Sequence, residues 1–169
     1  LLIATLSAIS KRGLDYNYIA DACVSWFTAN KFCSVREAFG IGETTLKSLV
    51  RFTQRELPAY ECGETDVKSN GNGSLKMMLP LAYYFTAKKS SKEEVYDVVK
   101  KVCSITHKNE LCICGCYIYV HFVMLILNGK NKLGAQTSTE NYVGKYVKFG
   151  EILVETVLFV ITYAVFRLN

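Results

Sequence analysis

The residues best suited to hold a ligand lie in one stretch, residues 69–82, where a polar turn runs straight into an apolar segment. Gly71 and Gly73 flank Asn72, and glycine permits positive φ angles and a close approach of the backbone to a neighbour or ligand. Ser74 is suited to cap a following helix whose free N–H groups would face the turn. The pattern is that of a binding loop and equally that of an ordinary helix start.

Cysteine and histidine side chains offer two further candidates for chemistry. On a helix, Cys112 and Cys116 would share a face while Cys114 points away, so the three thiolates would not converge on one zinc ion. Cys103 and His107 are four residues apart and would share a helix face, as a nucleophile and its base require. No oxyanion site can be placed beside them, which favours a packed thiol next to a histidine at a helix end.

The acidic residues are poorly arranged for a divalent cation, which needs several converging oxygen ligands. No two of the aspartates lie within three residues of each other; they are Asp15, Asp21, Asp66 and Asp97. The adjacent pair Glu93-Glu94 is better explained by a helix cap that begins at Ser91. We therefore predict no metal ion, no cofactor and no catalytic residue.

Length and composition indicate one all-α domain, residues 1–169, of about seven helices. The chain can bury a core without a metal or disulfide, half of its residues are hydrophobic, and apolar residues recur at helical spacing. Seven cysteines, an odd number, indicate free thiols in a reducing compartment. No secretory leader pattern opens the sequence given, and we expect a cytoplasmic protein.

The net charge of +5 is spread thinly, and the lysine pairs are typical of solvated helix faces. Binding of RNA or DNA is an open alternative, and the lysines that would carry it are Lys130, Lys132, Lys145 and Lys148.

The expected helices start at Leu2, Asp15, Glu43, Gly73, Ser91, Glu110 and Gly150. The third would turn Leu46, Leu49, Val50 and Thr53 inward, and the fourth would contain Pro80 as a kink or in its first turns. Residues 111–127 are apolar on all sides, which favours a fully buried central helix over a membrane span. Residues 130–141 would form a polar loop. In residues 150–168, Glu155 would cap, pair with a lysine or face a cleft.

Several motifs, in order, resemble the ADP-ribosylglycohydrolase family. They are the helix from Asp15-Tyr16 with Trp26, residues 39–45 (Phe-Gly-Ile-Gly-Glu-Thr-Thr), residues 71–75 (Gly-Asn-Gly-Ser-Leu) leading into Leu79-Pro80-Leu81-Ala82, and Thr106-His107. Residues 150–166, with Val154-Glu155-Thr156, are similar to the helix before the last metal motif of the family.

The resemblance implies an all-helical fold with two magnesium ions in a central cleft, and removal of ADP-ribose from proteins or small molecules. It places Asn72, Gly73 and Ser74 near the ADP-ribose and His107 at the rim of the cleft. The aspartate-rich metal motifs would lie just before Leu1 and just after Asn169, so the sequence resembles the middle of such an enzyme. Met77 stands where the family usually has arginine, which removes a donor fork for phosphate, and Lys108 stands where proline often follows.

Without metal ligands, the family's hydrolysis has no means of activating water. We therefore expect a pseudoenzyme, a binding or interaction protein on a truncated scaffold, for instance an inhibitor encoded by a phage or other mobile element. Missing terminal helices would uncover apolar faces and favour a protein partner or a homo-oligomer, with no membrane. The main alternative is an ADP-ribosyl hydrolase, or a fragment of one, that uses magnesium bound by residues from elsewhere.

Overall fold

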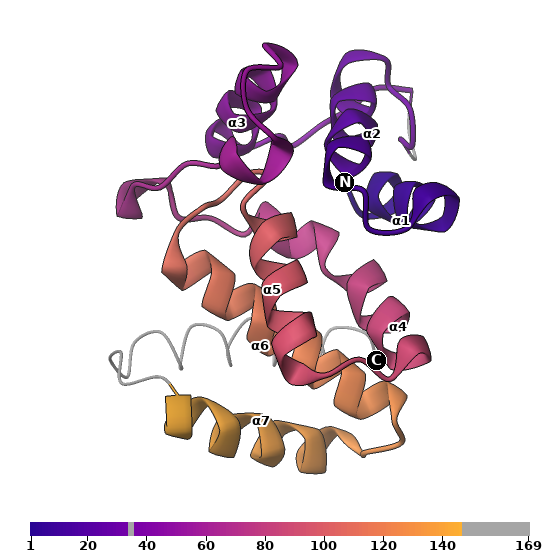
Figure 1. Ribbon diagram of the computed structural model, residues 1–169, viewed down its shortest axis with the longest axis vertical. Helices are drawn as coiled ribbons and strands as arrows, with labels where there is room; N and C mark the ends of the chain where they lie inside the picture. Colours follow the sequence, from indigo (N-terminus) through magenta and orange to yellow (C-terminus); the bar gives the residue numbers. More distant parts are fainter. Residues whose placement is uncertain (34–35, 147–169) are drawn as a thin grey trace.

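The computed structural model describes residues 1–33 and 36–146, with side chains described up to residue 139. Over these residues the chain forms α-helices, short 3₁₀ turns and one isolated bridge between Glu64 and His107, so the predicted all-α class is confirmed (Figure 1). The helices are α1 (Leu2–Arg12), α2 (Tyr16–Thr28), α3 (Glu43–Thr53), α4 (Leu79–Lys88), α5 (Lys92–Cys103), α6 (Glu110–Leu127) and α7 (Lys132–Tyr146). The 3₁₀ turns are η1 (Ala59–Glu61), η2 (Val67–Ser69) and η3 (Ser74–Met77).

Local signals in the sequence set several helix ends as predicted. Asp15 accepts a hydrogen bond from the backbone N–H of Tyr18 at 2.9 Å and begins α2. Ser91 accepts one from the N–H of Glu94 at 3.2 Å and begins α5. Both side chains satisfy donors that a helix start leaves free. Gly129, at φ 88°, follows the last turn of α6.

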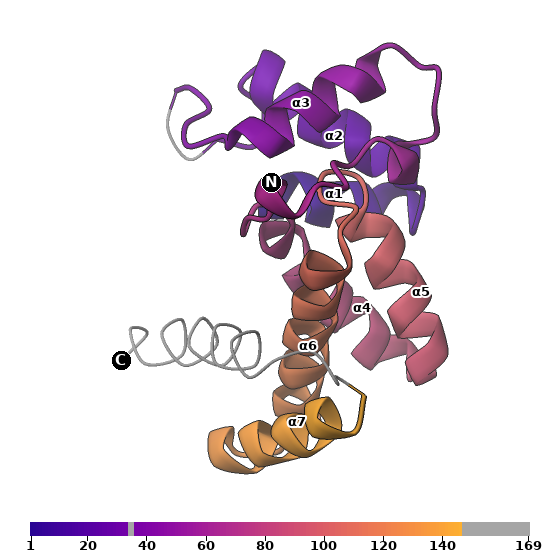
Figure 2. The ribbon, with the colours of Figure 1, turned by 90° about the vertical axis from the view of Figure 1, so that its left-hand side faces the viewer.

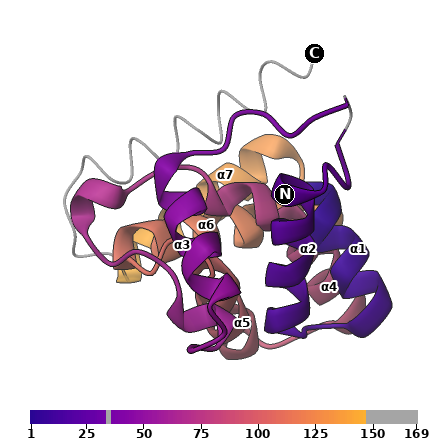
Figure 3. The same ribbon diagram turned by 90° about the horizontal axis from the view of Figure 1, so that it is seen from above.

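The long helix α6 is the axis of the fold. Helices α4 and α5 pack along it and α7 crosses its C-terminal half, while α1, α2 and α3 form the layer beyond its N-terminal end (Figure 2). Seen from above, α1 and α2 lie side by side (Figure 3). The core between these layers is aliphatic and aromatic, and its largest side chains at or below 2% exposure include Ile19, Leu49, Phe52, Phe85, Ile113 and Val120.

Helix α6 has the predicted bounds but not the predicted full burial. Only 39% of its 18-residue window is buried, and residues 123–127 are all half-buried. The helix is also long and apolar enough to cross a membrane by length and composition, a test that core helices of soluble proteins pass as well. Its apolar surface is therefore larger than the described helices cover.

The predicted inward face of α3 is partly wrong. Leu49 is buried and Leu46 half-buried, but Val50 is 51% exposed and Thr53 is exposed. The helix instead turns Phe52 inward, at 1% exposure, together with the small hydroxyl residues Thr45 and Ser48. A tertiary hydrogen bond from the Ser48 hydroxyl to the carbonyl oxygen of Thr106, described below, allows a buried polar group on this face of the helix.

Two further predicted elements differ from the structure. Residues 130–141 belong largely to α7, because Asn131 caps the N–H of Gly134 at 2.7 Å and Ala135 packs on α6. Within residues 132–139 the helix buries only the small side chains of Ala135 and Thr139, which give no clear apolar period in the sequence. The fourth helix begins at Leu79, not Gly73, after the turn η3, with Pro80 in its first turn as one alternative predicted. The predicted helix 150–168 and Glu155 lie outside the described residues.

Candidate functional site

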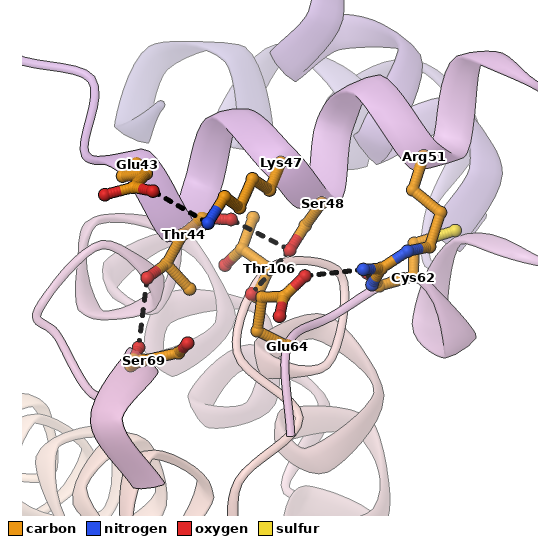
Figure 4. Close-up of polar contacts among 9 residues, drawn as sticks. All are labelled: Glu43, Thr44, Lys47, Ser48, Arg51, Cys62, Glu64, Ser69 and Thr106. Carbon is orange, nitrogen blue, oxygen red and sulfur yellow. Dashed lines mark hydrogen bonds and ion pairs between the residues drawn. The ribbon is translucent and has the colours of Figure 1, made fainter. Parts of the chain in front are cut away.

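The loop of residues 69–74 connects η2 to η3, and we call it the glycine loop. It lies against the N-terminal end of α3, where the hydroxyl of Thr44 donates to the carbonyl oxygen of Ser69 at 3.1 Å (Figure 4). It also lies against the N-terminal half of α6 through cysteine side chains. Two helices that are distant in sequence, α3 and α6, therefore set the position of the loop.

Residues 104–108 form the floor of the site and pair with the backbone of the preceding loop. The N–H of Gly63 donates to the carbonyl of Ser104 at 2.9 Å, and the N–H of Lys108 donates to the carbonyl of Glu64 at 2.8 Å. A Cβ atom at Gly63 would lie 2.4 Å from the Ser104 oxygen. This approach requires glycine, because backbone atoms cannot move aside cheaply.

Helix α3 holds this floor through one side chain and the preceding loop through another (Figure 4). The hydroxyl of Ser48 lies 2.9 Å from the carbonyl oxygen of Thr106. The guanidinium of Arg51 donates to the carbonyl of Cys62 and to the carboxylate of Glu64, each at 2.5 Å. The segment 62–64 is thus held on both sides, by α3 and by residues 104–108.

His107 lies directly beneath the glycine loop, at 2% exposure, and not at a rim. Its Nδ1 is 2.8 Å from the hydroxyl of Thr106. A Cβ atom at Gly73 would lie 2.8 Å from the ring carbon Cε1 and 2.5 Å from the hydroxyl of Thr45, and one at Gly71 would lie 3.3 Å from Nε2. Burial lowers the pKa of His107 from its ordinary value of 6.5, so the ring is neutral at pH 7.

Three thiols hold the loop and its floor from below. Cys116 donates to the hydroxyl of Ser74 at 3.3 Å, Cys112 to the side-chain oxygen of Asn70 at 3.4 Å, and Cys103 to the carbonyl of His107 at 3.2 Å. Burial raises the pKa of both Cys112 and Cys116, which keeps them protonated donors and poor nucleophiles. As the helical spacing predicts, these two share a face of α6, and Cys114 packs in a different cluster.

The predicted ligand-binding residues thus divide into exposed and buried members. Asn72 is exposed and Gly73 is half-buried, whereas Ser74 is 1% exposed and bonded to Cys116. Only the outer part of the loop is presented to a ligand.

The predicted lysine surface lies elsewhere. Lys130 and Lys132 are exposed beyond the C-terminal end of α6, whereas the glycine loop contacts its N-terminal half, and Lys130 donates to the hydroxyl of Ser138 at 2.7 Å. The side chain of Lys145 and all of Lys148 lie outside the described residues. The structure therefore places Lys130 and Lys132 away from the loop.

Sequence reasoning missed the supports of the loop. Gly63 lies in a polar stretch with no periodic pattern, and Thr45 belongs to the helix start and to the motif of residues 39–45, neither of which predicts a contact with the loop. A buried, isolated glycine indicates that another backbone segment approaches closely. The burial of Gly63 depends on tertiary contacts, so the sequence does not reveal it. The hydroxyls of Thr45 and Ser48 gave no signal of their own.

Comparison with protein families identifies the scaffold. The family model for ADP-ribosylglycohydrolase matches residues 1–157 of this 169-residue chain. The chain belongs to the ADP-ribosylglycohydrolase family. The resemblance stated from the motifs is thereby confirmed, as is the all-helical fold that it implied. No curated protein and no solved structure matched the chain.

The described residues of this ADP-ribosylglycohydrolase family member do not fit the two magnesium ions that the resemblance implied. Each of the four aspartates has a structural role: Asp15 caps α2, Asp66 caps η2, Asp21 pairs with Arg55 and Asp97 pairs with Lys101. In residues 1–33 and 36–139, no group of three or more His, Cys, Asp or Glu side chains is arranged to hold a metal ion. Converging oxygen ligands are what magnesium requires.

Proposed function

We propose that this ADP-ribosylglycohydrolase family member is a binding protein that holds an ADP-ribose-type ligand at the glycine loop without cleaving it. The observation that carries the proposal is the position of the aspartates, each of which is engaged in a helix cap or a surface ion pair. Without converging carboxylates, the described residues have no means of positioning a metal-bound water for hydrolysis.

The exposed part of the loop has groups suited to such a ligand. Asn72 presents an amide, which both donates and accepts hydrogen bonds and so suits the hydroxyl groups of a ribose. Asn70 already accepts a hydrogen bond from Cys112, which makes Asn72 the better candidate for direct contact. Lys76 is exposed in the turn that follows and supplies a positive charge for a diphosphate.

Equilibrium binding of ADP-ribose by titration calorimetry tests the proposal. We expect binding that does not depend on magnesium and an affinity that falls about three- to tenfold in the variant Asn72→Ala, as the loss of one net hydrogen bond predicts. The matched control is Asn128→Ala, which removes an exposed asparagine at the opposite end of α6 and should leave the affinity unchanged. Absence of ADP-ribose binding, or equal effects of the two variants, would contradict the proposal.

Family membership favours a second candidate function, an ADP-ribosyl hydrolase whose magnesium ligands come from outside the described residues or from a partner. The two candidates differ in turnover. Incubation with magnesium and an ADP-ribosylated protein, with free ADP-ribose as the readout, should show no release if the chain only binds. Release that requires magnesium and is lost in Asn72→Ala would establish the hydrolase instead.

A further inference from the structure

The ring of His107 is a part of the site whose chemistry the proposed function does not use. It is 2% exposed, and its Cε1–Nε2 edge faces the backbone of Gly71 and Gly73. The other edge is occupied, since Nδ1 is 2.8 Å from the hydroxyl of Thr106. The loop therefore rests on an imidazole that is almost fully covered, and lifting the glycines would give solvent greater access to the loop side of the ring.

We propose that His107 is the positioning residue of the glycine loop, which it holds closed as a neutral ring and releases when it is protonated. This inference rests on the proposed function of the loop as a binding site. A charged imidazolium needs a hydrogen-bond acceptor or water at both nitrogens. On the loop side the ring faces Gly71 and Gly73 so closely that a Cβ atom at either position would lie 2.8–3.3 Å from it. Because only 2% of His107 is exposed, protonation favours a state in which the loop has moved and more solvent reaches the ring.

Among the described residues, the groups around the ring offer no counter-charge that would change this conclusion. The facing groups on α3 and on the loop are the hydroxyl of Thr45 and the backbone of residues 71–73. Nearby charges on the adjoining segments are already paired: Glu64 with Arg51, Lys108 with Glu61, and Glu43 with Lys47. The titratable groups of α5 and α6 that contact this region are the thiols of Cys103, Cys112 and Cys116. Burial is the one cause that lowers the pKa of His107.

The direction of the pH effect follows from linkage. The closed loop lowers the pKa of His107 below 6.5, and an open loop would return it toward that value. At neutral pH neither state binds the proton, so the closed loop is unaffected. As the pH falls below 6.5, the open state takes up the proton first. The ratio of open to closed loop therefore rises, by at most about 30-fold at pH 5.

Hydrogen exchange of the peptide that covers residues 69–78, in the full chain at pH 7.5 and pH 5.0, tests the inference without any ligand. After correction for the intrinsic exchange rate, we expect wild-type protection of this peptide to fall about tenfold or more at pH 5.0. His107→Gln, which keeps a neutral polar side chain, should show no such fall. The chain has one other histidine, and burial also lowers the pKa of His121. His121 stacks on Tyr117 within α6, so the control His121→Gln should retain the wild-type pH response of the loop.

A second measurement keeps the inference testable if His107→Gln does not fold, which circular dichroism would show. Histidine-labelled wild-type protein gives two imidazole resonances, and the midpoint of the His107 titration should coincide with the midpoint of loop opening. The inference would be overturned if the hydrogen-exchange protection of residues 69–78 did not change with pH. It would also be overturned if the loss of protection at pH 5.0 persisted in His107→Gln. A pH-dependent loop in a protein that does not bind ADP-ribose would overturn the proposed function and leave the role of His107 intact.

Discussion

At the scale of single residues, the site is built from side chains that support the loop and a few that face outward. The hydroxyl of Ser74 bonds to Cys116 and Nδ1 of His107 bonds to Thr106, and both residues are buried, at 1% and 2% exposure. Glycine is required where the loop comes closest to its floor, since a Cβ at Gly73 would lie within 3 Å of two side chains. The chemistry that the residue types suggest is therefore mostly used for support.

Gly73→Ala tests how tightly the loop is seated. The new methyl group would lie 2.5 Å from the hydroxyl of Thr45 and 2.8 Å from the His107 ring, so we expect a loss of about 1–3 kcal/mol in the free energy of unfolding, measured in urea. The double variant with Thr45→Ala removes the nearest atom and should recover part of the Gly73→Ala loss. Gly42, where a Cβ would meet nothing within 4 Å, is the control position. A Gly73→Ala loss no larger than that of Gly42→Ala would show that the loop is not packed as described.

At the scale of elements, α3 and residues 104–108 act as a clamp on residues 62–64. The clamp joins parts of the chain that are up to 58 residues apart, through the contact of Ser48 with Thr106. Arg51 adds two donors, one to a backbone carbonyl and one to Glu64. Removing the arginine leaves the Cys62 carbonyl without that donor. A substitution that altered only a surface charge would leave this carbonyl hydrogen-bonded.

Arg51→Ala should therefore lower the free energy of unfolding by about 1 kcal/mol, since its side chain is 40% exposed and solvent screens part of the interaction. The control is Lys47→Ala on the same helix, whose partner Glu43 is an exposed neighbour one turn away. That variant should leave the urea midpoint unchanged. Equal midpoints for the two variants would indicate that Arg51 is only a surface charge.

Local signals predicted helix ends well and tertiary contacts poorly. Caps such as Asp15 and Ser91 act within one turn, so their position in the sequence is enough to place a helix start. The inward face of α3 could not be predicted, because the burial of Ser48 depends on tertiary contacts such as its hydrogen bond to Thr106, 58 positions away. Likewise, the glycines indicated where the glycine loop lies, but nothing local showed that His107 would lie beneath it.

At the scale of the whole molecule, the notable feature is apolar surface that the described helices leave exposed. Ile3 and Leu6, three residues apart on one face of α1, are 51% and 47% exposed. The opposite face of the same helix, with Ala4 and Ala8, is fully packed in the core. An exposed apolar helix face on a protein of this size is a common site of self-association.

We predict that the protein forms a homodimer through this face of α1. Light scattering should show a mass that rises with concentration from 19.0 kDa toward twice that value. Leu6→Lys introduces a charge that a paired apolar face cannot solvate, so it should shift the mass to that of the monomer. Val50→Lys is the matched control, since Val50 is equally exposed, at 51%, but lies on α3. A monomer at all concentrations, with no binding of a hydrophobic dye, would contradict the prediction. A dimer that persists equally in Leu6→Lys and in Val50→Lys would also contradict it.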